Sequence, residues 1–490
     1  MCNESRRNFI KQSALLAAGS ALVPGLLHAQ SKQVKIAIVG AGMAGLNAAY
    51  QLKKQGVIAD IYEASSRSGG RMFTMKNLFG EGTTTDIGGE FVDTTHEDII
   101  GLMNEMGLPF YDLRNDKLES HAYYFDNRLL TKDELKNALK PYAKKIEADI
   151  KSLPKEINHT TASQFQHLDN LSITEYMQQL DINGWLYKLI DVVLTREYGM
   201  EASEQSLINF LIMFNEPTDE HGEYTLFGDE HEVFKIKGGS QHLADAVFEK
   251  VKHQVKLKHK FTAVKQTGDA YTLSFETATD KKEVVADYVV MAIPFSVLRN
   301  IRMDVVMPAE KRTCINELGY GNGSKFVMGI KGKPWRRKEQ QGYTFNDLSF
   351  GCGWDSTQMQ TETNASFTVF GGGNFANHVY ETKEDVLASS FIQSLDEIYT
   401  GVKEGYTKKN IKYCWARNPY SFGSYTSFKK GQWSTLAGWE AVPVGNMFFA
   451  GEHVSLDFQG YMNGAAKTGR IAAEQIIEKI NKPKENKVRA

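Results

Sequence analysis

The first feature of the sequence that could carry chemistry is a glycine cluster near the N-terminus. Gly40, Gly42 and Gly45 follow the apolar run VKIAIVG in the spacing G-x-G-x-x-G. The first glycine permits a tight turn, the second lets backbone N–H groups approach a pyrophosphate, and the third lets a helix pack closely on a strand. Glu63 stands eighteen residues beyond Gly45, where a carboxylate can accept hydrogen bonds from a ribose. The spacing predicts a dinucleotide-binding site.

The elements around these glycines are those of a βαβ unit. VKIAIVG is typical of a strand that is buried on both faces of a parallel sheet. LNAAYQLKKQG has the apolar spacing of a helix that stops at Gly56, and IADIYEA indicates a second strand. A lone glycine motif is often a chance loop, but this order of elements favours the dinucleotide site.

Lys325 is the second unusual residue, because it begins the apolar run KFVMGI. A buried ammonium group is costly unless its charge has a purpose. The alternative is a lysine at a strand edge that points to solvent. We favour a functional ammonium group and treat Lys325 as a candidate catalytic residue.

Composition excludes several other kinds of protein. The chain has 490 residues, 42% hydrophobic and 24% charged, which indicates a globular protein of two or three domains. Its formal net charge of −2 provides no bulk positive field for nucleic acid. The four cysteines form no spacing that suits a metal, and no nucleophile elbow is present. We therefore expect no metal site and no nucleic-acid partner.

Residues 1–30 have the pattern of an export signal. The run from Ser5 to Lys11, SRRNFIK, precedes a mild apolar stretch that ends in small residues. This stretch is too short and too interrupted to span a bilayer, so we expect no integral membrane segment. The paired arginines resemble a twin-arginine signal with Ile in place of the usual Leu, and the alternative is a chance basic pair. We expect a periplasmic or secreted protein.

Further motifs give the chain a family resemblance. YEASSRSGGR ends at Arg71, DIGG begins at Asp86, and FAGEH and GYMNGAAKTGRIAAE stand near the end of the chain. Together with GAGMAGLNAAYQL, these runs resemble the flavin-containing amine oxidase family, which includes monoamine, polyamine and L-amino acid oxidases. The match covers nearly the whole chain after residue 33 and is weakest in the helical insert described below. It implies FAD as cofactor, because a nicotinamide enzyme needs neither the GGR run nor the GE block.

We predict an α/β fold on this basis. A discontinuous Rossmann-like FAD-binding domain would comprise residues 33–100, 232–310 and 430–480. Residues 101–231 and 311–429 would form a mixed α+β substrate-binding domain with a helical insert, since EDIIGLMNEMG and TKDELKNALKPYAKKIEADIKSL have helical spacing. The short strands after residue 232 are expected to rejoin the first sheet and add an antiparallel layer. Residues 481–490 would be a solvated basic tail.

The resemblance implies a set of residues in contact with FAD. Arg71 would donate to the pyrophosphate, and Glu452 would hold the ribityl or phosphate region. Covalent monoamine oxidases have a cysteine where this chain has Ser424, and because a hydroxyl group cannot form the thioether, we predict noncovalent FAD. The whole set is Gly40, Gly42, Met43, Ala44, Gly45, Glu63, Ala64, Arg67, Gly70, Arg71, Gly88, Gly89, Glu90, Phe261, Glu452, Tyr461 and Met462.

The resemblance also assigns catalytic positions. Tyr425 and Tyr461 match the two tyrosines that flank the amine in front of the flavin, where electron-rich faces align the nitrogen. Trp415 matches another pocket position, and core packing is the alternative for all three residues. Lys325 matches the lysine that holds a water against flavin N5, where it would stabilise the negative charge that develops as O2 is reduced.

The substrate stays open between an amine and an L-amino acid. Many family members that oxidise amino acids have an arginine after the DIGG block, but this chain has Glu90 and Asp93 there. Two carboxylates disfavour an anionic group and tolerate an amine or a cationic side chain. GGEFVDTTH nevertheless also resembles exported bacterial L-amino acid oxidases. If this chain is such an oxidase, Arg196 or Arg417 would bind the carboxylate of the substrate.

We expect oxidative deamination of a primary amine by O2 to an imine, followed by release of an aldehyde, NH3 and H2O2. An L-amino acid oxidase that yields a keto acid is the first alternative, and a flavin desaturase or a non-catalytic FAD protein is the second. The expected partners are a small amine or amino acid and O2, and a homodimer stays open.

Overall fold

The computed structural model describes residues 34–214, 231–360 and 363–482. The predicted export signal lies outside the described residues, and so does nearly all of the predicted basic tail. From Lys35 onward the chain is a single structural unit. None of the helices in the described ranges combines the length and the apolar character that crossing a bilayer requires.

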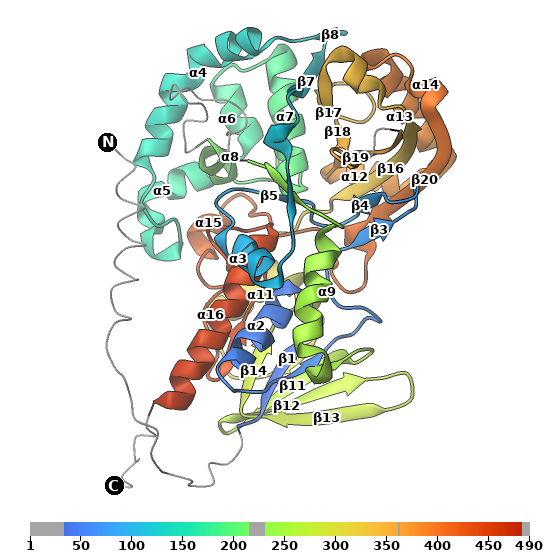
Figure 1. Ribbon diagram of the computed structural model, residues 1–490. Coiled ribbons are helices and arrows are strands. Elements are labelled where there is room, and N and C mark those ends of the chain that lie inside the picture. Colours follow the sequence, from blue (N-terminus) through green and yellow to red (C-terminus); the bar gives the residue numbers. More distant parts are fainter. Residues whose placement is uncertain (1–33, 215–230, 361–362, 483–490) are drawn as a thin grey trace, which may run out of the picture. The chain divides into compact units, whose positions relative to one another are not determined.

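The segments predicted to bind the dinucleotide contribute to one five-stranded parallel sheet (Figure 1). Its order is β10-β2-β1-β14-β21, with the bounds Val255–Lys256, Asp60–Tyr62, Ile36–Val39, Tyr288–Met291 and Met447–Phe449. β1 is buried along its whole length, as expected for a strand covered on both faces. Because β1 and β21 come from opposite ends of the chain, the sheet is assembled from separated segments.

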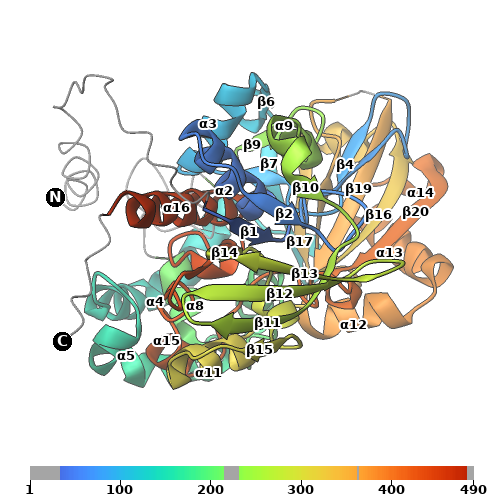
Figure 2. The ribbon, with the colours of Figure 1, turned by 90° about the horizontal axis from the view of Figure 1, so that it is seen from below.

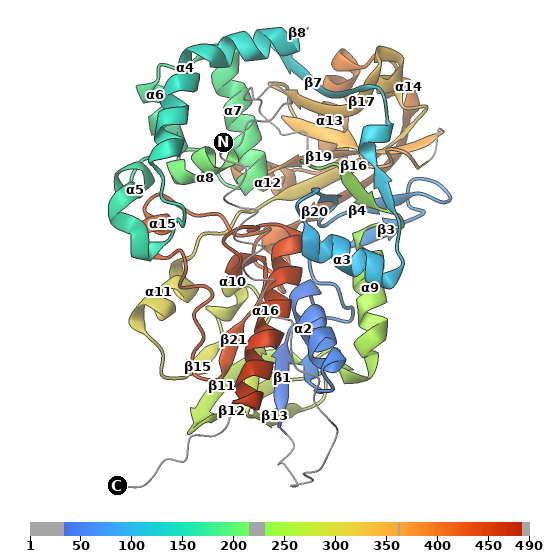
Figure 3. The same cartoon turned by 60° about the vertical axis from the view of Figure 1, so that its left-hand side comes forward.

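Three helices lie beside this sheet (Figure 3), namely α2 (Met43–Lys54), α9 (Ser240–Val251) and α16 (Met462–Asn481). α2 contacts both of the others. The side-chain amide of Asn47 donates a hydrogen bond to Ala466 O at 2.7 Å, near the start of both α2 and α16. The N-terminal ends of these two helices therefore lie close together.

A second, four-stranded sheet packs on this part of the chain (Figure 2). Its order is β13-β12-β11-β15, with the bounds Lys281–Ala286, Ala270–Glu276, Lys260–Thr267 and Arg302–Asp304. The ring of Phe275 in β12 stacks on Tyr62 in β2 with 4.4 Å between centroids. The predicted antiparallel layer is thus the β11–β13 part of this separate sheet, whose fourth strand, β15, pairs in parallel with β11, and the sheet joins the first by side-chain packing.

The largest sheet has seven strands in the order β20-β16-β19-β18-β17-β7-β8. Their bounds are Tyr406–Cys414, Ser324–Lys331, Asn364–Gly371, Cys352–Asp355, Gln340–Asn346, Glu119–Phe125 and Arg128–Leu129. The helices α12 (Gly373–Glu381), α13 (Glu384–Ile398) and α14 (Val402–Gly405) pack against β16 or β20. β16 lies between β19 and β20, so its first residues are interior to the sheet.

The segment predicted as a mostly helical insert holds α4 (Lys132–Ser152), α5 (Ala162–Asp169), α6 (Ile173–Gln179), α7 (Gly184–Tyr198) and α8 (Leu207–Met213). The start of α4 carries a capping box between Thr131 and Glu134, which explains why its helical pattern was clear. The prediction was nevertheless incomplete, because β7 pairs in parallel with β17. Its sequence ESHAYYF contains aromatic residues that favour a strand but lacks alternating polarity.

The strand β9 (Phe234–Ile236) corrects another expectation. It was expected to rejoin the first sheet, but it pairs antiparallel with β5 (Phe91–Val92) and β6 (Phe110–Asp112). β9 therefore connects the start of the insert to the residues that follow the DIGG block. The remaining elements are β3 (Thr74–Lys76), β4 (Thr84–Asp86), α3 (Glu97–Met106), α10 (Phe295–Leu298), α11 (Ala309–Glu317) and α15 (Gln432–Thr435).

Candidate active site

The glycine turn has the shape that a pyrophosphate site needs. A Cβ atom on Gly45 would lie 2.0 Å from Gly40 O, so the packing of α2 on β1 requires glycine there. A Cβ on Gly42 would meet only the Cα of Gly70, at 3.9 Å. Close packing thus explains why Gly45 is a glycine, whereas the space beside Gly42 is open.

The helix that follows can supply donors to an anion. Gly42 is the N-cap of α2, and within the described residues no side chain caps the helix and its first turn has no acidic residue. The same holds for α16, whose N-cap is Tyr461. The first N–H groups of a helix lack partners inside it and carry partial positive charge. The backbone N–H groups of Met43 and Ala44 in α2, and of Met462 in α16, can therefore donate to an anionic group, and their contact with the cofactor stays a prediction.

Glu63 lies at the end of β2, next to Ala64. Its Oε2 accepts a hydrogen bond from Ala41 N at 2.8 Å, and its Oε1 accepts one from Ser65 N at 2.7 Å. Each carboxylate oxygen keeps a lone pair that can accept from a ribose hydroxyl. Phe261 is in β11, where its buried ring packs 5.6 Å from Phe275.

The GGR loop folds back onto the glycine turn, with Gly69 N donating to Ala41 O at 2.8 Å. Arg67 holds the loop by donating to Gly70 O at 2.6 Å. Arg71 then reaches across to the C-terminal motifs, and its Nη1 donates to Ser424 O and to Glu452 Oε1, both at 2.7 Å. The Nε and Nη2 hydrogens of Arg71 have no acceptor among the described residues, so they fit the predicted phosphate contact.

Glu452 is buried, and burial by itself raises the pKa of its carboxyl group. The Arg71 guanidinium outweighs that effect and holds the pKa below its usual value. Glu452 Oε2 also accepts from Gly460 N at 2.9 Å. The carboxylate is therefore ionised, and it joins the GGR loop to the segment that carries Tyr461.

The two tyrosines are brought to the same helix. Tyr425 OH donates to Arg196 O at 2.8 Å, and Tyr461 OH donates to Glu197 Oε1 at 2.6 Å. Burial, followed by the charge of Glu197, raises the pKa of both phenols, so both stay protonated at neutral pH. Residues that are 36 positions apart in the sequence are thus fixed on consecutive residues at the end of α7.

Ser424 and Trp415 both bond to backbone groups of the protein. The Oγ of Ser424 accepts from Gly323 N at 3.0 Å, which ties this hydroxyl to the start of β16. Trp415 donates through Nε1 to Ile87 O at 3.0 Å, and its ring lies 4.7 Å from that of Tyr413. Trp415 therefore supports the DIGG block, and its catalytic role stays a prediction.

Lys325 is an interior residue with 5% of its surface exposed, so the alternative of a solvent-facing edge lysine was wrong. Its Nζ donates to Asp86 O at 2.8 Å, to Gly88 O at 3.0 Å and to Glu90 Oε2 at 2.8 Å. Three acceptors use all three hydrogens of an ammonium group. The adjacent Gly89 lies against Met462, because a Cβ there would be 2.9 Å from Met462 Cγ.

The carboxylates that were interpreted as open to a cationic substrate are already occupied. Glu90 pairs with Lys325 and also with Lys235, whose Nζ lies 2.7 Å from Oε1. Asp93 Oδ1 accepts from Glu232 N at 2.7 Å, and Oδ2 lies 3.6 Å from ring nitrogens of two histidines, His96 and His231. Both carboxylates therefore already have positively charged partners in the protein, so they attract a cationic substrate less than their residue types alone suggest.

The two arginines considered for a substrate carboxylate differ. Arg196 is buried, and its guanidinium binds Glu197 at 2.8 Å and Glu232 at 2.7 Å. Arg417 is exposed and stacks on Tyr380 at 4.4 Å, in a surface hollow of about 320 Å³. Arg196 alone lies with the tyrosines, and its charge is compensated twice.

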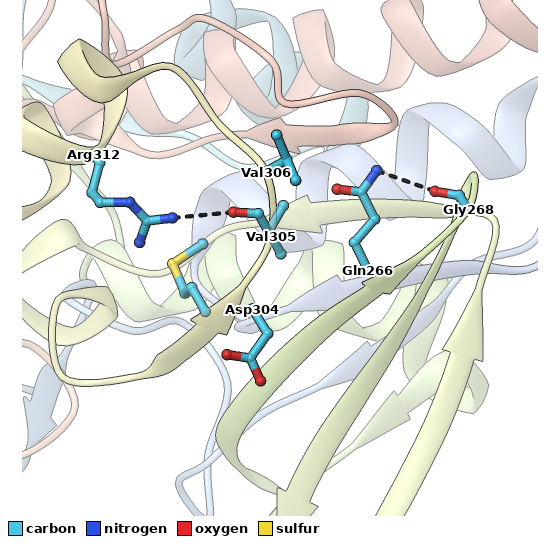
Figure 4. Close-up of a pocket in the computed structure, with 7 residues that line it drawn as sticks. Gln266, Gly268, Asp304, Val305, Val306 and Arg312 are labelled. Carbon is cyan, nitrogen blue, oxygen red and sulfur yellow. Dashed lines mark hydrogen bonds between the residues drawn. The ribbon is translucent and has the colours of Figure 1, made fainter.

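The surface has a larger hollow of about 530 Å³ beside β11 and β15 (Figure 4). Its polar groups bind one another, since Arg312 donates to Val305 O at 3.1 Å and Gln266 to Gly268 O at 3.2 Å. None of its lining residues belongs to the predicted site. We assign it no role.

Sequence reasoning missed Glu197, Glu232 and Lys235. The signal for Lys235 was present, because it stands between apolar residues in FKIKGG, just as Lys325 stands at the start of an apolar run. Glu197 follows Arg196 directly, but only the fold shows that Tyr461 binds it. Glu232 had no local signal.

A glycine turn followed by a helix N-terminus with open backbone donors is the arrangement that binds the pyrophosphate of a dinucleotide. Comparison with known proteins gives the family. The model for flavin containing amine oxidoreductases matches residues 43–477, and the chain belongs to this family. It is a flavin-dependent oxidoreductase with FAD as its cofactor, as predicted.

The chain is similar over most of its length to oxidases of two kinds. It is 23% identical to an L-amino-acid oxidase of Vipera ammodytes ammodytes, over 92% of this chain and 94% of the relative. It is 25% identical to amine oxidase [flavin-containing] A of Sus scrofa, over 92% and 86%. These names include both substrate classes, so they do not choose between them.

Solved structures confirm the predicted fold class. Cyclohexylamine oxidase from Brevibacterium oxydans IH-35A superposes with a TM-score of 0.81 at 20% identity, covering 92% of this chain and all of that one. Wild-type putrescine oxidase bound to putrescine gives a TM-score of 0.78 at 20% identity, covering 91% and 99%.

Proposed function

We propose that this enzyme oxidises a primary amine that carries no carboxylate beside the reacting carbon. The observation that supports this most is the pairing of Arg196, the arginine next to the tyrosine contacts, with both Glu197 and Glu232. The guanidinium keeps unused donors, since its Nε is buried and has no partner among the described residues, but a substrate carboxylate there would be a third negative group beside Glu197 and Glu232. Adding a charge that is not compensated to a buried site is costly, whereas a neutral amine adds none.

FAD, when bound, would accept a hydride from the carbon that bears the amine and pass two electrons to O2, so that amine, O2 and water give aldehyde, NH3 and H2O2. The chain's own residues would orient the substrate and exclude water. Tyr425 and Tyr461 are fixed by α7 through their hydroxyl groups, so their rings have little freedom. The burial of these two tyrosines also favours the neutral form of a substrate amine bound beside them, which is the form that can lose a hydride.

Noncovalent binding of FAD is part of the proposal. Ser424 stands where a cysteine would form the thioether, and its hydroxyl is bonded to Gly323 N. The contacts available to FAD are then the helix N-termini, Glu63 and Arg71. Acid precipitation of the purified yellow protein should leave the flavin in the supernatant, and flavin that stays in the pellet would contradict this.

The substrate class can be tested with pairs that differ only in a carboxylate. Peroxide formation would be measured for phenethylamine against L-phenylalanine, isoamylamine against L-leucine and cadaverine against L-lysine. We expect kcat/KM to be about tenfold or more higher for the amine of any pair that is oxidised, since the acid brings a further negative charge next to the buried carboxylates of Glu197 and Glu232. Faster oxidation of the amino acids would establish the L-amino acid oxidase instead, and no peroxide from any pair would leave the desaturase or the non-catalytic protein.

We also propose export by the twin-arginine route, which carries folded proteins and so allows FAD to be inserted before export. The signal in residues 1–30 lies outside the described residues, and its support is the SRRNFIK run. Replacing Arg6 and Arg7 with Lys should retain active enzyme in the cytoplasm. Unchanged activity outside the cytoplasm would reject this route.

A further inference from the structure

A buried carboxylate lies between two lysines that come from distant parts of the chain. Lys235 Nζ is 2.7 Å from Glu90 Oε1, and Lys325 Nζ is 2.8 Å from Glu90 Oε2. Each of the three side chains has at most 6% of its surface exposed. Trp354 adds a neutral contact, since its Nε1 donates to Glu90 Oε1 at 3.0 Å. We call Lys325, Glu90 and Lys235 the lysine–carboxylate array.

The array carries two positive charges and one negative charge. Burial raises the pKa of Glu90, but the charges of Lys235 and Lys325 outweigh burial and keep the carboxyl group ionised. One carboxylate cannot neutralise two ammonium groups. The carboxylate of Asp86 interacts electrostatically with Lys235 and with Glu90, but it accepts its hydrogen bonds from Thr74 and Ser240 and gives Lys325 only its backbone carbonyl. Without Lys235, Lys325 and Glu90 would form a neutral pair.

The donors of the two lysines are used differently. Lys325 gives all three hydrogens to protein oxygens, whereas Lys235 has two acceptors among the described residues, Glu90 and Ser356 O at 2.6 Å. Lys325 has no hydrogen left for a water unless it releases one of these bonds. Its effect on a neighbouring group is therefore exerted first through its charge, and that charge depends on how far Glu90 cancels it.

We propose that Lys235 is a positioning residue for the half-reaction with O2: by pairing with Glu90, it leaves the positive charge of Lys325 uncancelled. The inference rests on the proposed function and on the position beside flavin N5 that the family resemblance implies for Lys325. In this half-reaction the reduced flavin anion, O2 and one proton give oxidised flavin and H2O2. Negative charge moves onto oxygen during the transfer, and an uncancelled ammonium group stabilises it.

Sulfite provides a test that needs no turnover, because it adds to oxidised flavin to give an anionic adduct that is visible in the absorbance spectrum. Lys235→Met removes one positive charge from the array, so the dissociation constant for sulfite should rise by about tenfold, as should the time for reoxidation by O2. Glu90→Gln removes one negative charge and should lower the dissociation constant. Lys235→Arg should stay near the wild type.

Lys333→Met is the matched control. Lys333 is also buried, and its Nζ likewise binds one carboxylate, of Asp355 at 3.2 Å, and one backbone carbonyl, of Thr357 at 2.8 Å. Its loss imitates the structural cost of removing a buried ion pair, but it should leave the affinity for sulfite unchanged.

Two outcomes would overturn the proposal. One is a wild-type affinity for sulfite in Lys235→Met, or in Lys235→Gln if the methionine variant does not fold. The other is a shift in the same direction for Lys235→Met and Glu90→Gln, which would indicate distortion of the site and not its charge. The failure of the proposed function is separate, because an enzyme that oxidises none of the amines can still be titrated with sulfite.

Discussion

Lys325→Met should slow reoxidation of the reduced enzyme by O2 by roughly 100-fold, the effect of losing one preorganised charged donor at a site of developing negative charge. The structure makes this residue interior, with its ammonium group fixed by Asp86 O, Gly88 O and Glu90. Methionine has a similar length and no charge. Anaerobic reduction by substrate should change far less, because the negative charge that hydride transfer leaves is spread over the flavin ring, whereas reoxidation concentrates negative charge on O2.

Stopped-flow absorbance separates these two half-reactions. The control is Lys331→Met, which removes an exposed lysine from the end of the same strand and should leave both rates unchanged. A Lys325→Met enzyme that is reoxidised at the wild-type rate would remove Lys325 from the mechanism.

Tyr461→Leu should slow anaerobic flavin reduction by up to about 100-fold, since misplacing a substrate by about 1 Å has effects of that size. The ring of Tyr461 is held by the bond from its hydroxyl to Glu197 and by His96, whose ring centroid lies 5.1 Å away. Leucine removes the aromatic face that would align the amine. Reoxidation by O2 should stay near the wild-type rate.

Tyr461→Phe keeps the ring and removes only the bond to Glu197, which still pairs with Arg196. We expect this variant to retain most of the rate, and Tyr425→Leu to behave like Tyr461→Leu. If the leucine variants reduce their flavin as fast as the wild type, the tyrosines are packing residues and the amine is aligned by other groups.

Local sequence was sufficient for the dinucleotide half of the site. Gly40, Gly42, Gly45 and Glu63 lie in one βαβ unit, so their spacing along the chain already determines their geometry. The contacts of Gly45 with Gly40 O and of Glu63 with Ala41 N are made within that unit. Periodicity likewise located α3 and α4, but it missed β7, whose position depends on pairing with β17.

Residue types in the sequence were also enough to single out Lys325, because an ammonium group in an apolar strand is unusual wherever the strand lies. They were misleading for Glu90 and Asp93, which the sequence shows as two carboxylates without showing their partners. Lys235 reaches Glu90 from β9, and Glu232 N reaches Asp93 from the residues before that strand.

The sequence by itself thus determined the family, the cofactor motif and the type of each charged group. Only the tertiary structure decided which charges cancel, since Arg196 meets Glu232 across 36 residues and Lys325 meets Glu90 across 235. The physical reason is that a buried charge acts through the partners within a few ångströms of it, and the fold selects those partners regardless of their separation in sequence.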